Sequence, residues 1–532
     1  MLFDIFKVIA IALLCTAASV HYIHVLQMER YQLPGYRNWL NRNLMGRIVR
    51  ENVLWAFVLG GVSLYLEIPL SMFMTGEAAR KALAGWLTLL FFGGVTGYIT
   101  WRDYHWPSRK PFVATLRVRR LMGVLLAEYV LGGALLALVT IPPYFLFAAV
   151  PYLVGLAAMI INPYENRLNA GFFKSAKQKL RARKDLIKIG ITGSFGKTNV
   201  KFILRDILSR RYKVLATPAS FNTAMGISRV VNDDLTDEHQ VFIAEMGATH
   251  VGDIKELVDL VRPKYGILTS VGARHLDTFG SIENIASTKY ELIQGLPKSG
   301  LAVFGSGEYI DRLYAQCEKE KCRVSIVPGE EAYMSCEHIN FSSKGTSFIM
   351  ICEDGERVSC RTRLLGGFNV ENILLASALA HKMGIPLEEI GEAVKELQPI
   401  EHRMQLIPGD LNVIDDSLNE DEDGAFEALR VLAQMPGRRI VITPGLEDQS
   451  EKGGDLNFAL GTVMADCADT VIMVGSRPNS RTMVAGLVKS GFARTNVLTA
   501  DDMDAAEEIL EEISEDGDTV LFESRIPDYE EM

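Results

Sequence analysis

The sequence has few cysteines, and they do not show the paired spacing of a redox or zinc motif. No two of them are separated as C-x-x-C. The seven cysteines among 532 residues are Cys15, Cys317, Cys322, Cys336, Cys352, Cys360 and Cys467. A cytoplasmic location, argued below, keeps thiols reduced, so we predict free cysteines. A zinc site within the cluster Cys317–Cys360 remains open as an alternative.

The sequence also lacks an excess of positive charge. Its 55 lysines and arginines face 65 aspartates and glutamates, for a net charge of −10, which argues against nucleic acid as a partner. No internal repeat or low-complexity tract is evident. What is abundant is apolar: 48% of the residues are hydrophobic, a high share for a wholly soluble protein.

The apolar excess lies at the N-terminal end. Five runs approach the ~20 residues that a helix needs to cross hydrocarbon: they are Ile5–Leu26, Val53–Met74, Ala82–Trp101, Leu121–Thr140 and Pro142–Ile161. We therefore predict a transmembrane module of about five helices over residues 1–165. The first run has no small-residue cleavage site typical of a signal peptide. The last two runs are separated only by Ile141–Pro143, so one kinked or re-entrant element is an alternative.

Charge between the runs predicts an orientation. The segments 27–52, 102–120 and 162–188 are rich in arginine and lysine, whereas the second loop has only Arg80 and Lys81 and the fourth has neither residue type. The positive-inside rule then places the N-terminus outside and everything after Ile161 in the cytoplasm. Residues 166–185 are predicted to be a basic cytoplasmic linker, which either contacts anionic lipid headgroups or is a solvated helix.

Beyond residue 185, short β-branched runs alternate with helical patterns, which indicates a doubly wound parallel sheet. We predict a central α/β domain over 186–400 and a Rossmann-like C-terminal domain over 401–532. The expected strands are Ile187–Ile191, Val241–Ala244, Tyr265–Thr269, Ala302–Phe304, Ile440–Thr443, Val471–Val474 and Thr519–Phe522. Segments near Val324–Val327, Phe348–Ile351 and Val358–Arg363 are expected to be short antiparallel strands.

The segment Gly190–Thr198 carries the strongest chemical signal, because a glycine loop between a strand and a helix cradles phosphate. The loop residues are Gly193, Ser194, Gly196, Lys197 and Thr198. Backbone N–H groups and Lys197 are suited to a polyphosphate, and the Thr198 hydroxyl to Mg²⁺. The loop departs from the G-x-x-x-x-G-K-[ST] pattern, since Ile191 occupies the position of the first glycine. The sequence therefore predicts ATP and Mg²⁺ as cofactors.

Three further residues form a constellation with this loop. Glu245 ends a strand, where a carboxylate beside a phosphate loop meets bound Mg²⁺; His275 follows the next strand, and Lys289 lies one helix further on. Taken alone, each has an ordinary interpretation as a surface carboxylate, a loop histidine or a solvated lysine. Their order along the chain favours one joint site.

With these motifs the chain resembles the Mur ligase family, in particular the members that add D-alanyl-D-alanine to a UDP-N-acetylmuramoyl-tripeptide. The resemblance covers roughly residues 186–532. The motifs that carry it are Thr192–Thr198, Phe221–Gly226, Glu245–His250, Arg262–Pro263, His275–Ser281, Lys289, Gly367–Asn372, Arg403 and Asp415–Asn419.

The resemblance implies an ATP-dependent, ADP-forming amide ligase that works through an acyl phosphate. Lys197, His275 and Lys289 are then catalytic. Thr198, Glu245 and His275 bind metal ions, and Lys289 becomes carbamylated, so that its carbamate also binds metal. Further residues implied to bind the nucleotide are Asn369, Asn372, Arg403 and Asp416. Those implied to bind the cell-wall precursor and an amino acid or dipeptide are Asn222, Thr223 and Asn419.

The apolar runs occupy the place of the family's UDP-binding domain, which leaves rival functions open. One is a ligase that acts on a lipid-linked carboxylate or polymerises an acidic amino acid. Another is an ATP-regulated membrane transporter or scaffold, although the chain lacks an ABC-type signature. We expect a multi-pass protein of the cell membrane with cytoplasmic ligase domains.

Overall fold

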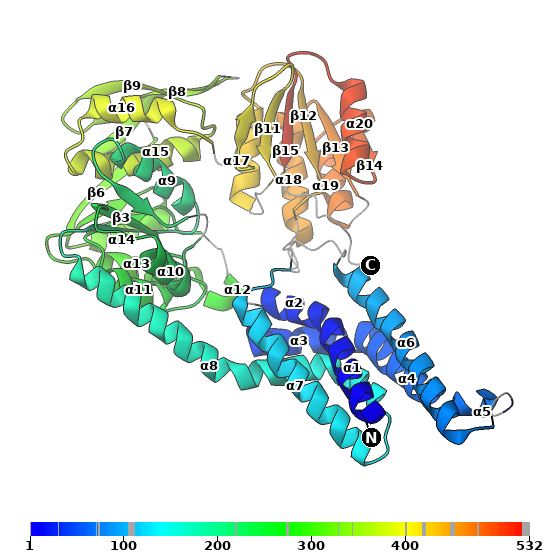
Figure 1. Cartoon of the computed structure of the whole chain (residues 1–532). Helices are drawn as coiled ribbons and strands as arrows, with labels where there is room; N and C mark the ends of the chain where they lie inside the picture. The colour runs from blue at the N-terminus through cyan, green and yellow to red at the C-terminus, as the bar shows by residue number, and fades with distance from the viewer. Residues whose placement is uncertain are drawn as a thin grey trace. The chain divides into compact units, whose positions relative to one another are not determined.

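The computed structural model divides into a helical unit that ends at Ala170 and a unit over Gly171–Ile526 that contains two α/β domains (Figure 1). The structure describes every residue except 1, 30, 71, 73–74, 105–111, 219–220, 273–275, 328, 343, 400–401, 418–421, 447–452, 476–477 and 524–532.

The first unit is entirely helical in the residues described. Its elements are α1 (Leu2–Ala18), α2 (Val20–Met28), α3 (Leu33–Arg42), the π-helix η1 (Leu44–Val53), α4 (Leu54–Tyr65), α5 (Glu67–Leu70), α6 (Glu77–Tyr104), α7 (Leu116–Leu138), the 3-10 turn η2 (Pro143–Phe145) and α8 (Leu146–Ala182), which continues into the second unit. A buried cluster that includes Ile11, Leu26, Phe92, Leu125 and Phe147 joins several of these helices.

Four stretches are long and apolar enough to cross a membrane, namely 5–28, 79–103, 116–138 and 143–182. They coincide with four of the five predicted runs. The second predicted run, Val53–Met74, contains the 12-residue α4 and the short α5, and its role as a span stays a prediction. Helix α7 ends before Pro142 and Pro143, because proline lacks an N–H and restricts the residue before it. The last two runs are thus separate helices.

The central domain is built on a nine-stranded sheet of order β2-β3-β1-β4-β5-β6-β7-β8-β9. Its strands are β1 (Ile187–Thr192), β2 (Val214–Ala216), β3 (Val241–Glu245), β4 (Tyr265–Leu268), β5 (Leu301–Phe304), β6 (Glu320–Ser325), β7 (Met334–Ser342), β8 (Gly345–Cys352) and β9 (Arg357–Thr362). Strands β1 to β7 pair in parallel, whereas β8 pairs antiparallel with β7 and β9. The prediction that the strand near 324–327 is antiparallel is wrong, because β6 continues the parallel sheet.

Helices cover both faces of this sheet, as the doubly wound prediction requires. The helices are α9 (Lys197–Leu208), α10 (Ala224–Asp233), α11 (Asp253–Val261), α12 (Leu276–Phe279), α13 (Ile282–Gln294), α14 (Glu308–Gln316), α15 (Gly367–Lys382) and α16 (Leu387–Glu396). One core contains side chains of α9, α15 and α16, and the other those of α10, α11, α13 and α14.

The basic segment 166–185 is more than a linker. It is helical to Ala182, as the second half of α8. Ala176 and Leu180 are buried in the core that also holds Leu257 and Leu292. The Lys179 ammonium also donates to the Asn232 carbonyl oxygen at 3.3 Å. The apolar face of this segment therefore belongs to the central domain.

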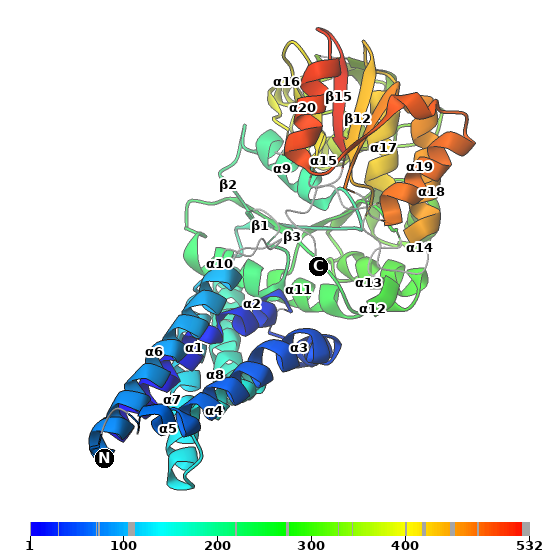
Figure 2. The ribbon, with the colours of Figure 1, turned by 90° about the vertical axis from the view of Figure 1, so that its right-hand side faces the viewer.

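The C-terminal domain has a six-stranded sheet of order β10-β11-β15-β12-β13-β14. Its elements are β10 (Gln405–Ile407), β11 (Asn412–Asp416), α17 (Glu422–Leu432), β12 (Arg439–Thr443), α18 (Gly453–Cys467), β13 (Thr470–Val474), α19 (Pro478–Lys489), η3 (Arg494–Asn496), β14 (Val497–Ala500), α20 (Met503–Ile513) and β15 (Thr519–Glu523). All pairs are parallel except β10 with β11. Figure 2 shows α20 on one side of β12 and β15, and α17 to α19 on the other.

Candidate active site

The predicted phosphate loop follows β1, which lies between β3 and β4 in the sheet. At Gly196 φ is +77°, and a Cβ there would lie 2.4 Å from Asn372 Oδ1. A Cβ at Gly193 would lie 1.9 Å from Thr269 Oγ1. Both positions therefore require glycine, one for its backbone conformation and both for the close approach of a neighbouring side chain. Gly193 and Gly196 are therefore sufficient to form the loop without a glycine at position 191.

The end of β4 holds this loop in place. The Ser194 N–H donates to the Ser270 carbonyl oxygen, and the Phe195 N–H to Ser270 Oγ, both at 2.9 Å. The Gly272 N–H donates to Ser194 Oγ at 2.8 Å. The Thr269 hydroxyl donates to the Phe195 carbonyl oxygen. These contacts fix the loop backbone, so its remaining N–H groups are set in place before a ligand arrives.

Two lysine ammonium groups converge on one loop carbonyl. Lys197 Nζ donates to the carbonyl oxygens of Gly193 at 2.7 Å and Ser194 at 3.0 Å. Lys289 Nζ, from α13, donates to the same Gly193 oxygen at 2.9 Å. Lys289 is only 5% exposed, which excludes its interpretation as a solvated helix position. The loop thus concentrates two positive charges beside a helix N-terminus, an arrangement suited to a polyphosphate.

The Glu245 carboxylate is the second centre of the site. It ends β3 directly opposite Ile191 of β1 and is 1% exposed. Its Oε2 accepts from Thr198 Oγ1 at 3.0 Å and from Lys201 Nζ at 2.9 Å. Its Oε1 accepts from Asn222 Nδ2 at 3.1 Å. The structure therefore brings together three predicted residues, Thr198, Asn222 and Glu245.

Lys201 is the residue that the sequence analysis missed. Its side chain is fully buried against Glu245. Burial lowers the pKa of its ammonium group, and the adjacent carboxylate opposes that shift. The available signal was its position on α9, because a lysine four residues after Lys197 lies on the same helical face, directly after the buried Val200.

The donor set at Glu245 fits a magnesium ion. Mg²⁺ prefers oxygen ligands and usually keeps waters and substrate phosphates besides one or two carboxylates. Glu245 Oε2 and Thr198 Oγ1 supply two such oxygens 3.0 Å apart. His275, the other predicted ligand, lies outside the described residues. Within the described ranges, no three acidic, histidine or cysteine side chains form a metal-binding group, and all seven cysteines are buried and free.

The two asparagines predicted to contact nucleotide lie beside the loop helix. Asn369 and Asn372, on α15, are buried at 2% and 4% exposure. Asn369 Oδ1 accepts from Asn199 Nδ2 at 2.8 Å and from Asn372 Nδ2 at 3.4 Å. Since Asn372 Oδ1 also approaches Gly196, α15 forms one wall of the loop. Direct contact of either asparagine with adenine stays a prediction.

Of the three residues predicted to bind substrate, one lies in the Glu245 cluster. Asn222 contacts Glu245, as described above, whereas Thr223 caps α10 by accepting from the Gly226 N–H at 3.2 Å. Capping alone accounts for a threonine at this position. Asn419 lies outside the described residues.

Arg403 and Asp416 lie at the start of the C-terminal domain. Arg403 is exposed, and the buried Asp416 accepts from the Met404 N–H at 2.8 Å. Next to them, His402 Nδ1 lies 2.7 Å from Asp415 Oδ2. Burial raises the pKa of the Asp415 carboxyl, but hydrogen bonds from Ser417 and His402 outweigh it and leave the pKa below its usual value. The nucleotide contacts of Arg403 and Asp416 stay predictions.

We expect Lys201→Met to destabilise the central domain by about 3–5 kcal/mol, because it leaves the Glu245 carboxylate buried without its cation. Thermal unfolding of the detergent-purified protein measures the loss. The double variant Lys201→Met/Glu245→Gln should recover most of it, and Lys213→Met, at an exposed lysine, is the control. An unchanged unfolding temperature for Lys201→Met would show that the pair does not hold the site.

Comparisons with known proteins identify this arrangement. Residues 191–380 match the Mur ligase middle domain, and residues 402–525 match the Mur ligase glutamate ligase domain. These segments contain every predicted site residue. The loop, the Glu245 cluster and Lys289 all belong to the first of them.

Relatives with the name UDP-N-acetylmuramoyl-tripeptide--D-alanyl-D-alanine ligase align with most of this region. The protein of Treponema pallidum is 27% identical over 360 residues, which cover 63% of this chain and 71% of the relative. That of Mycobacterium tuberculosis is 30% identical over 358 residues, which cover 63% and 70%.

Solved structures share the fold. MurF from Acinetobacter baumannii superposes with a TM-score of 0.59 at 22% identity, covering 67% of this chain and 77% of that one. MurF from Thermotoga maritima in complex with ADP gives 0.59 at 21% identity, covering 67% and 80%. Together with the domain matches and the phosphate loop, these similarities show that the chain belongs to the Mur ligase family of ATP-dependent, ADP-forming amide ligases.

Proposed function

We propose that this protein is a membrane-anchored ligase that adds D-alanyl-D-alanine to a muramoyl-peptide precursor of the cell wall at the cytoplasmic face. The observation that carries the proposal is the convergence of Lys197 and Lys289 on Gly193, next to the Glu245 cluster. The names of the relatives supply the substrates. The four apolar helices support membrane anchoring, and the positive charge of the segments 102–120 and 162–188 supports cytoplasmic ligase domains.

The reaction has two steps. A carboxylate oxygen of the acceptor attacks the γ-phosphorus of ATP, the bond to the bridging oxygen breaks, and ADP leaves with the electron pair. The amine of the donor then attacks the acyl carbon, loses a proton and releases phosphate, which leaves an amide. Since both reactants of the first step are anionic, the positive charges of Lys197 and the loop N–H groups lower the repulsion between them.

Metal binding extends this assignment. Thr198 and Glu245 would hold Mg²⁺ between the protein and the phosphates, with His275 as a further ligand, and the ion would offset charge on the transferred phosphoryl group. Release of Glu245 from Lys201 would free an oxygen for the ion. Lys289 is the residue for which we propose carbamylation, a reaction in which its amine adds to CO₂ and loses a proton.

The remaining site residues are proposed as binding groups. Asn369 and Asn372 would position the adenine end of ATP, because they line the loop helix from α15. Arg403 would reach the phosphates and Asp416 the ribose. Asn222, Thr223 and Asn419 would contact the acceptor and the amine. Asn222 has the strongest support, since its amide already touches the proposed metal carboxylate.

A second candidate acceptor follows from the N-terminal module. The matched family domains begin at residue 191, and the preceding residues form apolar helices. We therefore also propose a lipid-linked carboxylate as the acceptor, or the polymerisation of an acidic amino acid. ADP release by the purified protein, with each acceptor and amine offered in turn, distinguishes these from the muramoyl peptide.

We expect Lys197→Ala to lower acceptor-dependent ADP release by about a hundredfold or more, because it removes a charge that faces the transferred phosphate. The exposed Lys213→Ala serves as the control for protein quality. Undiminished ADP release in Lys197→Ala would contradict the site.

We expect Lys289→Ala to lose ligation and to regain part of it in the presence of acetate, whose carboxylate substitutes for the carbamate oxygens. Lys289→Arg keeps the charge but cannot be carbamylated, so it should remain inactive. The exposed Lys298→Ala, just beyond the same helix, is the matched control. Full activity of Lys289→Ala in the absence of acetate would contradict the carbamylation proposal.

The role of the membrane module can be tested by truncation. A fragment over 171–532 keeps Ala176 and Leu180, which a cut at residue 186 would remove from the core. We expect it to bind ATP but to turn over the native acceptor more slowly, because the binding energy of the remote part of the acceptor orients its carboxylate. Rates equal to those of the full chain on soluble and lipid-linked acceptors would show that the module only anchors.

A further inference from the structure

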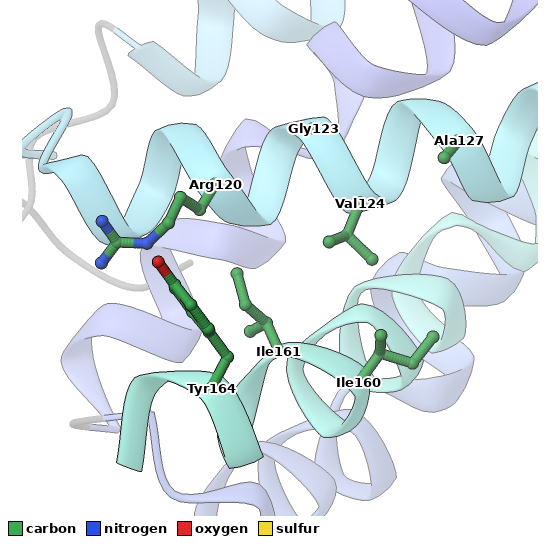
Figure 3. Close-up of a pocket in the computed structure, with 7 residues that line it drawn as sticks. All are labelled: Arg120, Gly123, Val124, Ala127, Ile160, Ile161 and Tyr164. Atoms are coloured by element: carbon green, nitrogen blue, oxygen red, sulfur yellow. The ribbon is translucent and has the colours of Figure 1, made fainter. Parts of the chain in front are cut away.

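A groove of about 500 Å³ lies between α7 and α8 in the helical unit. The groove is shallow and open along one side. The lining residues are Arg120, Gly123, Val124, Ala127, Ile160, Ile161 and Tyr164. In Figure 3, Val124, Ile160 and Ile161 form the apolar stretch, and the Arg120 and Tyr164 side chains lie together at one end. The groove is therefore apolar over most of its length, with one charged side chain at one end.

Arg120 can bind a ligand at that end. Its Nε and one Nη donate to Glu165 at 2.6 and 2.9 Å, which fixes the plane of the guanidinium. The other Nη has no hydrogen-bond partner among the described residues, and the side chain is 36% exposed. A guanidinium held in this way presents its unused N–H groups to an anionic oxygen at little conformational cost.

The charge of this end is complementary to a phosphate. Arg117, Arg119 and Arg120 lie in the first two turns of α7, and Arg167 follows on α8. Glu165 is the one acidic residue of 115–121 and 162–170, so these segments are net positive by three. The N-terminus of α7 adds its partial positive charge. Glu128, which does not line the groove, lies about 12 Å along α7 from Arg120.

We propose that this groove binds a phosphate-bearing anionic membrane lipid, with one hydrocarbon chain against Val124, Ala127 and Ile160 and the phosphate at Arg120. Both helices are candidate membrane spans, and their basic ends lie on the side predicted to face the cytoplasm. Anionic lipid there meets both the apolar wall and the arginines. The site goes beyond the ligase reaction and rests only on the proposed membrane placement.

Two glycines provide a matched test. Gly123 lines the groove on α7, Gly97 lies on α6, and an added Cβ at either position meets no atom within 4 Å. Gly123→Leu places its side chain in the groove, whereas Gly97→Leu adds the same side chain elsewhere. Native mass spectrometry of the full-length protein, offered phosphatidylglycerol and phosphatidylcholine with identical acyl chains, measures retained lipid.

We expect wild type and Gly97→Leu to retain phosphatidylglycerol over phosphatidylcholine by about tenfold, or about 1.4 kcal/mol. Gly123→Leu should lose about tenfold in phosphatidylglycerol binding. The double variant Arg120→Gln/Glu165→Gln keeps a neutral hydrogen-bonded pair and should bind both lipids equally.

Three results would overturn the proposal. The first is equal lipid retention by Gly123→Leu and Gly97→Leu, and the second is headgroup selectivity that survives in the double variant. The third concerns the unfolding temperature of the protein: inorganic phosphate would raise it as much as phosphatidylglycerol does. Because lipid retention is measured without ATP or acceptor, failure here is distinguishable from failure of the ligase proposal.

Discussion

The Glu245 carboxylate connects the parts of the site. Through its two oxygens it joins the end of β3 to the first turns of α9 and to the loop before α10. A carboxylate this deeply buried is stable only with a cation and further donors, and Lys201 supplies that cation. The phosphate loop, which lies between β1 and α9, is therefore positioned relative to β3 by one charged contact and not by packing alone.

The phosphate loop has Ile191 in place of the usual first glycine, and its contacts explain why it tolerates this residue. Glycine is needed at Gly193 and Gly196, where a Cβ would lie within 2.4 Å of a neighbouring side-chain oxygen. Contacts from Thr269 and Ser270 then complete the loop. Its shape is specified by the end of the adjacent strand as much as by its own sequence.

Much of the fold could be predicted from the sequence, because buried parallel strands read as apolar β-branched runs and the loop has a strong local pattern. Lys201 was missed although its spacing from Lys197 was a signal, since the burial of a lysine is recognisable only from the carboxylate that pairs with it. The parallel pairing of β6 with its neighbours could not be predicted from the local sequence either, because the direction of a strand depends on how the chain connects it to the next strand. The helical continuation of α8 was masked by its lysines, whose charged ends lie outside while Ala176 and Leu180 point inward.

The C-terminal half of α8, which packs into the central domain, precedes that domain during synthesis. Ala176 and Leu180 leave the ribosome before any strand of the central domain, at a time when the preceding apolar helices are already available for insertion. Domains fold largely from the N-terminus onward during synthesis. The nascent sheet therefore emerges after the helical segment that supplies part of its core. If the apolar helices insert into a membrane as we propose, anchoring would precede folding of the ligase.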